Sequence, residues 1–294
     1  MDLIIVLVNG IAVGSIYGLI ALGFVLIYKA SRIINFAQGS LVLFGAYVVY
    51  ASYIQLKFPY IIVIIFSSII VVALGMGFQH AVLRKMIGKP VISIIMITIG
   101  LDYLIKGICL GVWGPTRRIF PGELIPEISL RIGPVFISNL FIWGFLISIF
   151  FLAGFSIFFK YSRIGIAMRA VSNDQMAALS LGISVNKILI YIWAVAALVA
   201  MVGGSLLAGL SILDLNLGFI GLIVFPVIIF GGMDSILGAV LGGFTVGILE
   251  SLAGAYLEGI VGGGIKGVAP FIIMLIMLMI MPYGLFGTKE VERL

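Results

Sequence analysis

Amide side chains beside a glycine form the most chemically suggestive cluster in this sequence. Asn35, Gln38 and Gly39 follow a short basic segment at Lys29 and Arg32 and open a long apolar run. Amides placed where a helix starts or breaks can offer hydrogen bonds to a polar solute in an apolar surrounding. We therefore expect these three residues to line a translocation pathway. The same amides would also serve simply to cap helices or to bridge neighbouring helices.

A second segment of the chain resembles this cluster and adds weaker candidates for the pathway. The residues from Ile34 to Phe44 can be laid on those from Leu215 to Phe225 at a constant offset of 181, which pairs Asn35 with Asn216. The two segments would enter a membrane from opposite sides, so the similarity predicts an inverted-topology repeat. The further pathway candidates are Asn216, Ser15 and Tyr17.

Two acidic residues fall inside apolar runs and need partners there. Asp102 has Lys106 four residues on, on the same face of a helix, so an ion pair is predicted. Glu250 would cost about 2.5–3.5 kcal/mol as an unpaired charge in lipid, so we expect a polar cavity or a partner. It marks either a coupling-ion or substrate site, or a position near the outer interface with ordinary solvation.

Catalytic and metal chemistry are disfavoured by the residues present. The sequence has one cysteine, Cys109, and one histidine, His80, which excludes an internal disulfide and any site that needs two of either residue. These two residues are expected on different spans, so no nucleophile and base stand at matched positions. We therefore expect neither an enzyme nor a metal site in this chain.

Two segments are similar in sequence to nucleotide-binding motifs but lack the structural context or the residues that such motifs need. The segment 262–267 fits GxGxxG, but it lies between apolar runs with no preceding strand, so a turn is predicted. The pair Gly88-Lys89 has Leu83 where a phosphate loop needs glycine, and Pro90 where it needs Ser or Thr. Any ATP that powers this protein would therefore be hydrolysed on another subunit.

The elements that position these residues are apolar helices. The chain is 63% hydrophobic and 10% charged, with a mean hydropathy of +1.34, which is far from the composition of soluble domains. Backbone groups in lipid must pair internally, and continuous apolar runs exclude an outer-membrane barrel. We predict an all-α polytopic membrane protein with about nine transmembrane helices (8–10). The predicted spans are 3–28, 33–54, 60–83, 91–108, 138–159, 187–210, 217–232, 235–257 and 266–286.

Charge sets the predicted orientation. With residue 1 outside, eleven of the seventeen basic residues face the cytoplasm, as the positive-inside rule requires. The net charge of +6 therefore reflects the membrane and anionic lipid, and nucleic acid is not needed to explain it. The N-terminus is expected outside and the C-terminus in the cytoplasm. The proline-containing segment 109–137 would form an extracytoplasmic loop, either a docking surface or a passive connector.

Small residues at helical spacing predict two close helix contacts. Each set lines one helix face and would let backbones approach closely inside a bundle. The two sets are Gly10, Gly14 and Gly18 in the first span and Ala239, Gly243 and Gly247 in the eighth.

The longest cytoplasmic segment, 160–187, contains a predicted amphipathic helix. Arg169 and Asp174 supply its charges, small residues line one face, and Gly182 can terminate it. Such a helix can dock into the groove of a partner, although a loop lying on lipid headgroups is the alternative.

Several motifs accompany this segment: Asn9-Gly10, Gly14-Ser15-Ile16-Tyr17-Gly18-Leu19, Ala21-Leu22-Gly23, Ile34-Asn35-Phe36-Ala37-Gln38-Gly39, Gly45-Ala46-Tyr47 and Gly231-Gly232-Met233-Asp234-Ser235-Ile236 with Gly238-Ala239. Together they resemble branched-chain amino-acid ABC permeases of the LivH type, over essentially the whole chain. Asp234 stands where that family commonly has glycine.

The resemblance implies that residues 1–294 form a single transmembrane permease domain of an importer in the bacterial cytoplasmic (inner) membrane. It implies as partners a second homologous permease, identical or related, two ATP-binding subunits that hold ATP and Mg²⁺, and an extracytoplasmic solute-binding protein. The coupling residues toward the ATPase would be Arg163, Gly165, Arg169, Ala170, Asp174, Ala177 and Gly182. The substrate would be a branched-chain amino acid or another amino acid, urea, an amide or an aromatic acid. An ion-coupled secondary transporter with Glu250 as titrating group is the alternative function.

Overall fold

Long apolar helices make up most of the computed structural model, which describes residues 3–86, 89–120, 130–132, 135–137, 139–261 and 263–287. Six helical segments in these residues are long and apolar enough to cross a membrane. They are α1 (Leu3–Ser31), α3 (Tyr60–Ala81) with η2 (Leu83–Met86), α4 (Val91–Trp113), α5 (Asn139–Tyr161), α8 (Val185–Leu210) and α10 (Ile236–Leu252) with η5 (Ala253–Leu257) and α11 (Glu258–Val261).

Two further apolar segments are shorter than a full span: the 3₁₀ turn η4 (Leu215–Phe219) with α9 (Ile220–Gly231), and α12 (Ile265–Ile280). The buried helix α2 (Gln38–Tyr50) continues into the π-helical turn η1 (Ala51–Gln55). Each of the nine predicted spans overlaps a helix. In the described residues, however, only six helical segments are long and apolar enough to confirm a membrane span. The second prediction began at residue 33, whereas the helix begins at Gln38 because the chain turns at Asn35.

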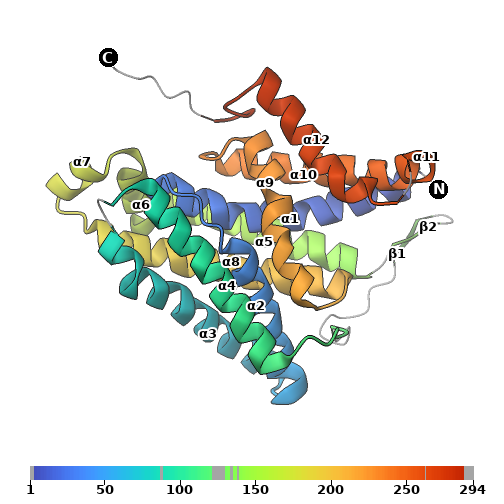
Figure 1. The fold of residues 1–294 in the computed structure, drawn as a ribbon, viewed down its shortest axis with the longest axis horizontal. Coiled ribbons are helices and arrows are strands. Elements are labelled where there is room, and N and C mark those ends of the chain that lie inside the picture. Colours follow the sequence, from blue (N-terminus) through green and yellow to red (C-terminus); the bar gives the residue numbers. More distant parts are fainter. Residues whose placement is uncertain are drawn as a thin grey trace.

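Helix α1 lies along the centre of the bundle and packs on both sides through small residues (Figure 1). Both predicted small-residue faces pack inside the bundle, and the structure shows that they pack against each other, so that α1 and α10 meet backbone to backbone. A methyl group at Gly14 would lie 2.6 Å from the carbonyl oxygen of Gly243, and one at Gly10 would lie 2.7 Å from Cα of Ile248. Lipid offers no hydrophobic drive to hold helices together, so this close fit supplies the packing energy.

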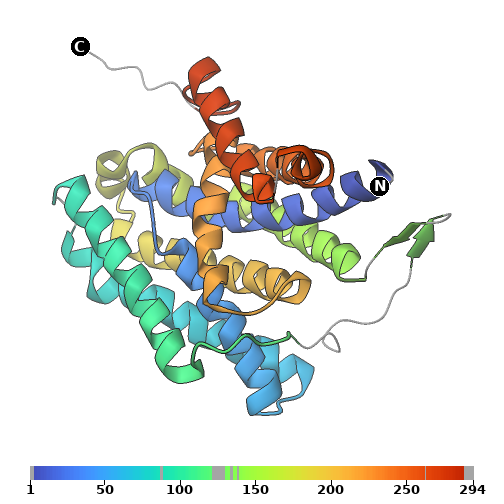
Figure 2. The ribbon, with the colours of Figure 1, turned by 45° about the vertical axis from the view of Figure 1, so that its right-hand side comes forward.

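Helices α3 and α8 make a second contact of this kind, since a methyl group at Gly75 would lie 2.8 Å from the carbonyl oxygen of Trp193. Helix α2 is buried along almost its whole length between α8, α4 and α3. In Figure 2, α9 runs steeply across α1 and points toward α2. These contacts make α1, α2 and α8 the core of the fold.

The two ends of the bundle carry different structures (Figure 1). The short helices α6 (Arg163–Asn173) and α7 (Gln175–Ser180) lie at one end. The antiparallel strands β1 (Leu130–Ile132) and β2 (Val135–Ile137) lie at the opposite end, with Leu130 paired to Ile137.

The predicted loop 109–137 starts later than expected, because α4 continues to Trp113. Residues 121–129 and 133–134 of this loop lie outside the described residues. Arg118 ties the loop to the rest of the chain through backbone hydrogen bonds with Leu213 of 2.9 and 3.0 Å.

The glycine-rich segment that matched a nucleotide motif by letters is a turn in its described part. Gly263 and Gly264 form the turn, and Gly264 has φ of 100° just before α12 begins at Ile265. Gly262 lies outside the described residues.

Candidate functional site

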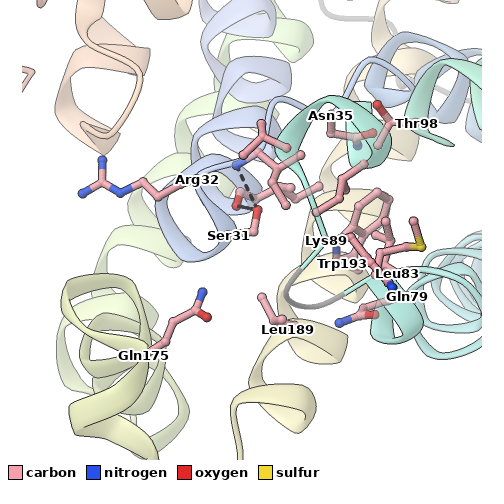
Figure 3. Close-up of a pocket in the computed structure, with 15 residues that line it drawn as sticks. Ser31, Arg32, Asn35, Gln79, Leu83, Lys89, Thr98, Gln175, Leu189 and Trp193 are labelled. Atoms are coloured by element: carbon pink, nitrogen blue, oxygen red, sulfur yellow. Dashed lines mark hydrogen bonds between the residues drawn. The ribbon is translucent and has the colours of Figure 1, made fainter. Parts of the chain in front are cut away.

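A cavity of about 220 Å³, with polar and apolar side chains in its wall, lies where α1 ends and the chain breaks before α2 (Figure 3). Its walls come from α1, α3, α4, α7 and α8, which are far apart in the sequence. Its polar lining consists of Ser31, Arg32, Asn35, Gln79, Lys89, Thr98 and Gln175. We refer to this space as the inner cavity, a name that follows the orientation predicted from the charges.

Asn35 is buried at the break and both lines this cavity and shapes the backbone. Its Oδ1 accepts a hydrogen bond from the N–H of Ala37 at 3.1 Å, and its Nδ2 donates to Oε1 of Gln38 at 3.3 Å. Such a side-chain turn competes with helix formation, which explains why α2 starts only after it. Nearby, the N–H of Phe36 donates to Oγ1 of Thr98 on α4 at 3.3 Å.

Gln38 and Gly39 lie inside the bundle and are absent from the wall of the inner cavity. Nε2 of Gln38 donates to the carbonyl oxygen of Ala196 on α8 at 3.3 Å, so this amide bridges two helices. Gly39 meets the start of α9, where a methyl group would lie 2.8 Å from the nitrogen of Gly221. The two shortened helices, α2 and α9, therefore touch at their N-terminal ends.

The other predicted pathway residues lie in a different place. Tyr17, Asn216 and Glu250 line a cavity of about 630 Å³, the outer cavity, together with Arg117, Asp214 and Lys266. The structure therefore brings Tyr17 and Asn216 together but separates them from Asn35. Ser15 lines neither cavity, because its Oγ donates to the carbonyl oxygen of Ala12 within α1 at 2.7 Å.

Asn216 shapes the start of η4. Its N–H donates to Oδ1 of Asp214 at 2.9 Å and its Nδ2 donates to Oδ2 at 3.1 Å, while Nε of Arg117 lies 3.5 Å from Oδ2. Asn216 is thus held by a neighbouring carboxylate on the cavity wall.

Glu250 was expected to have a polar cavity or a partner, and it lines the outer cavity together with the basic residue Lys266. It is 7% exposed, and Tyr17 lines the same cavity. Its Oε2 has no hydrogen-bond partner among the described residues. This burial contradicts the alternative of ordinary solvation at an interface.

The segment 160–187 forms two helices, whereas one helix was predicted. Helix α6 ends at Asn173 because Asp174 adopts an extended conformation and caps α7, its Oδ1 accepting from the N–H groups of Met176 at 2.8 Å and Ala177 at 3.0 Å. An aspartate that caps the following helix cannot continue the preceding one. Gly182 ends α7 as predicted, with φ of 78°.

Helix α6 is fastened to the end of α5. Nη2 of Arg169 donates to the carbonyl oxygen of Lys160 at 2.8 Å, and Gly165 lies so close that a methyl group there would be 2.6 Å from the carbonyl oxygen of Phe158. Ala170 packs against the core, whereas Arg163 and Ala177 are exposed at the surface.

Sequence reasoning missed Gln175 as a functional candidate. Its Nε2 donates to the carbonyl oxygen of Ala30 at the end of α1 at 2.8 Å, and its side chain also lines the inner cavity (Figure 3). Gln79, Thr98 and Trp193 were missed as well. Gln79 could have been found from the sequence, because it is a polar residue within an apolar run. In the structure its buried Oε1 has no hydrogen-bond partner among the described residues.

Replacing Asp174 with alanine is expected to loosen α7 selectively. Loss of this cap costs about 1 kcal/mol, which corresponds to roughly fivefold faster hydrogen exchange of the amides in Gln175–Ser180. Hydrogen–deuterium exchange with mass spectrometry measures this change, and Asn173→Ala serves as the neighbouring control. Equal exchange in the two variants would contradict the capping role.

Comparison with known proteins adds family information to this geometry. Residues 6–281 match the family model described as branched-chain amino acid transport system / permease component. The chain is 30% identical to the high-affinity branched-chain amino acid transport system permease protein BraD of Pseudomonas aeruginosa, over 98% of this chain and 96% of that protein. It is 27% identical to LivH, the permease protein of the corresponding system of Escherichia coli K12, over 97% of this chain and 96% of that protein.

One further relative comes from an archaeon, and one solved structure also matches. The probable branched-chain amino acid transport permease protein LivH of Methanocaldococcus jannaschii is 29% identical over 98% of this chain and 95% of that protein. Among solved structures, PsaBC from Streptococcus pneumoniae in complex with Fab matches with a TM-score of 0.49 and 15% identity, covering 97% of this chain and 94% of that chain.

Proposed function

Because this chain belongs to the family of branched-chain amino acid transport system permease components, we propose that it is the channel-forming subunit of an ATP-driven importer of branched-chain or related amino acids. The single observation that carries this proposal is the full-length family match, which includes the α6–α7 segment. The sequence has no phosphate loop of its own, so the energy would come from another subunit.

The proposed complex has five protein parts and a defined orientation. This chain pairs with a second permease, identical or related, and with two ATP-binding subunits that hold ATP and Mg²⁺. An extracytoplasmic solute-binding protein delivers the amino acid. The complex lies in the cytoplasmic membrane, with the N-terminus of this chain outside and α6 and α7 on the cytoplasmic side.

Contacts of α6 and α7 support their role in coupling. Arg169 ties α6 to the end of α5, and Gln175 ties α7 to the end of α1. A movement imposed on these two helices by an ATP-binding subunit is therefore passed to two membrane helices through charged or amide hydrogen bonds. The end of α1 leads directly into the inner cavity, at Ser31 and Arg32.

Helix pairing supports an inverted repeat behind alternating access. Helix α1 packs on α10 as α3 packs on α8, and the shortened helices α2 and α9 touch at Gly39 and Gly221. An exchange of α1 with α8, α2 with α9 and α3 with α10 leaves this pattern of contacts unchanged. Repeats of this kind can rock between inward-open and outward-open states, each favoured by a different partner.

An ion-coupled secondary carrier is the alternative, favoured by the buried Glu250 beside Lys266 in the outer cavity. Buried ionisable residues within membrane helices often serve as proton or ion relays. In this alternative the chain would work without ATP-binding subunits.

Reconstitution in proteoliposomes separates the two functions. We expect uptake of radiolabelled L-leucine or another L-amino acid to require ATP, both ATP-binding subunits and the binding protein, and to be unaffected by an ionophore. The Glu250→Gln variant should retain most of this uptake. Transport by the purified chain alone, abolished by an ionophore and by Glu250→Gln, would favour the secondary carrier.

A further inference from the structure

An ion pair lies in the middle of a membrane-spanning helix of this chain. Asp102 is the central residue of α4 (Val91–Trp113), and its Oδ2 lies 2.8 Å from Nζ of Lys106. The side chains are 16% and 25% exposed, so neither is sealed inside the bundle. Charged groups at this depth face a water-filled space or a protein partner, because hydrocarbon solvates them poorly.

The pair borders a cavity of about 260 Å³ between α4 and the start of α9. Its lining combines the two charges with aromatic and aliphatic groups, and it includes no other Asp, Glu, Lys, Arg or His among the described residues. The remaining lining residues are Phe36, Ile99, Tyr103, Gly218, Phe219, Gly221, Leu222 and Phe225.

Both interruptions of the helical bundle reach this cavity. Phe36 belongs to the break before α2, and Gly218 belongs to the 3₁₀ turn before α9. A methyl group at Gly218 would lie 2.9 Å from Cε of Lys106, so glycine makes room for the lysine side chain. Solute sites of membrane transporters commonly lie near the midplane at such broken helices.

The outward face of the cavity is uncovered in the single chain. Tyr103 is 72% exposed and Phe219 is 52% exposed, while Nζ of Lys106 lies 4.9 Å from the centre of the Phe219 ring. In the proposed complex, a second permease subunit placed over this face would leave room for a solute between itself and α4.

We propose that Asp102 and Lys106 bind the zwitterionic head group of an α-amino acid during its passage. The ammonium group of the solute would lie against Asp102 and its carboxylate against Lys106, with an apolar side chain among Phe219, Leu222 and Phe225. The inference rests on the proposed function and specifies where the substrate is recognised within the membrane.

Charge balance explains why a zwitterion fits better than an ion. The lining carries one positive and one negative group, so a cation or an anion is attracted by one of them and repelled by the other. A zwitterion placed antiparallel to the pair satisfies both charges at once. Because the pair already satisfies itself, binding is weak enough to let the solute leave, as conduction requires.

Neutralising variants of the complete reconstituted complex test this site with L-leucine, or with the L-amino acid that the wild-type complex imports. Asp102→Asn and Lys106→Gln are each expected to lower ATP-driven uptake about 10- to 100-fold, because a charged hydrogen bond to the solute is lost. The double variant should be as defective as either single variant. ATP hydrolysis stimulated by the loaded binding protein should remain near the wild-type rate. The control is Ser156→Ala, which removes a polar group from a different helix, α5.

A purely structural ion pair predicts the opposite pattern. Joint removal of both charges would then rescue the single variants, because no unpaired charge is left in the membrane. Restored uptake in the double variant would therefore overturn the site. Failure of the wild-type complex to import amino acids with ATP would instead overturn the proposed function.

Thiol labelling keeps the inference testable if the neutral variants assemble poorly. The native Cys109 is buried, so it gives little background. Tyr103→Cys should react with a charged, water-soluble thiol reagent and should be protected by L-leucine or the imported amino acid. Phe150→Cys, at the middle of α5 and 74% exposed on the single chain, should not react. No labelling at position 103, or equal labelling of both variants, would overturn the site.

Discussion

Replacing Gly39 with alanine is expected to destabilise the folded protein strongly. The added methyl group would lie 2.8 Å from the nitrogen and 2.9 Å from Cα of Gly221, and closer still to the carbonyl oxygen of Gly218. All of these atoms belong to backbone, so no flexible side chain can move aside. Overpacking a buried site costs about 1–3 kcal/mol and sometimes more, and the upper end applies here.

A glycine in an open position provides the matched control. Gly77 lies in α3, and a methyl group added there has no described atom within 4 Å apart from its chain neighbours and the backbone of its own helix. We expect Gly39→Ala to reduce the yield of monodisperse protein strongly and to lower its thermal unfolding temperature, while Gly77→Ala behaves as wild type. Size-exclusion chromatography and thermal denaturation of the purified protein measure both effects. Similar behaviour of the two variants would show that α2 and α9 do not meet closely at Gly39.

Reversing the charge of Arg169 is expected to uncouple ATP hydrolysis from transport. The wild-type guanidinium donates to the carbonyl oxygen of Lys160 at 2.8 Å and lies 6.0 Å from the centre of the Phe159 ring. Glutamate cannot donate this bond and brings a negative charge to the negative end of α5. A lost charged hydrogen bond costs about 1.5–3 kcal/mol, and partial exposure of Arg169 favours the lower value.

This energy corresponds to a reduction of amino-acid uptake by about tenfold or more. ATP hydrolysis by the assembled complex should continue, because the variant changes a contact within this chain. Lys85→Glu reverses the same charge in the exposed η2 turn and should leave uptake unchanged. Full uptake and normal assembly of Arg169→Glu would refute the role of α6 in coupling.

Local physics allowed much of the fold to be predicted. Apolar runs too long for a soluble protein predict membrane helices, because a lipid solvent leaves the backbone no other partners. Small residues four apart predicted that one face of α1 and one face of α10 pack closely inside the bundle, and the structure shows that these faces meet each other. The four-residue spacing of Asp102 and Lys106 predicted their ion pair. The count of nine spans was less well predicted, because hydropathy shows where an apolar run begins and not where its helix begins. The second apolar run was predicted to begin at residue 33, but helix α2 begins only at Gln38.

The candidate site could be predicted only in part. Asn35 lines the inner cavity, as its position beside a break in an apolar run indicated. Its expected mate Asn216 lines the outer cavity instead, since sequence similarity between two segments does not report which side chains share a space. The single coupling helix was divided at Asp174 because the capping hydrogen bonds stabilise a new helix start more than a continued helix.

By itself, then, the sequence determined that this protein is an α-helical membrane protein, which faces of its helices pack closely, and which charges pair within one helix. These properties depend on residues within a few turns of each other. Only the tertiary structure decided that Gln38 bonds Ala196, that Gln175 bonds Ala30, and that the two broken segments meet beside Asp102. Such contacts join residues far apart in the chain, and the free energy that selects them arises only when the helices are packed together.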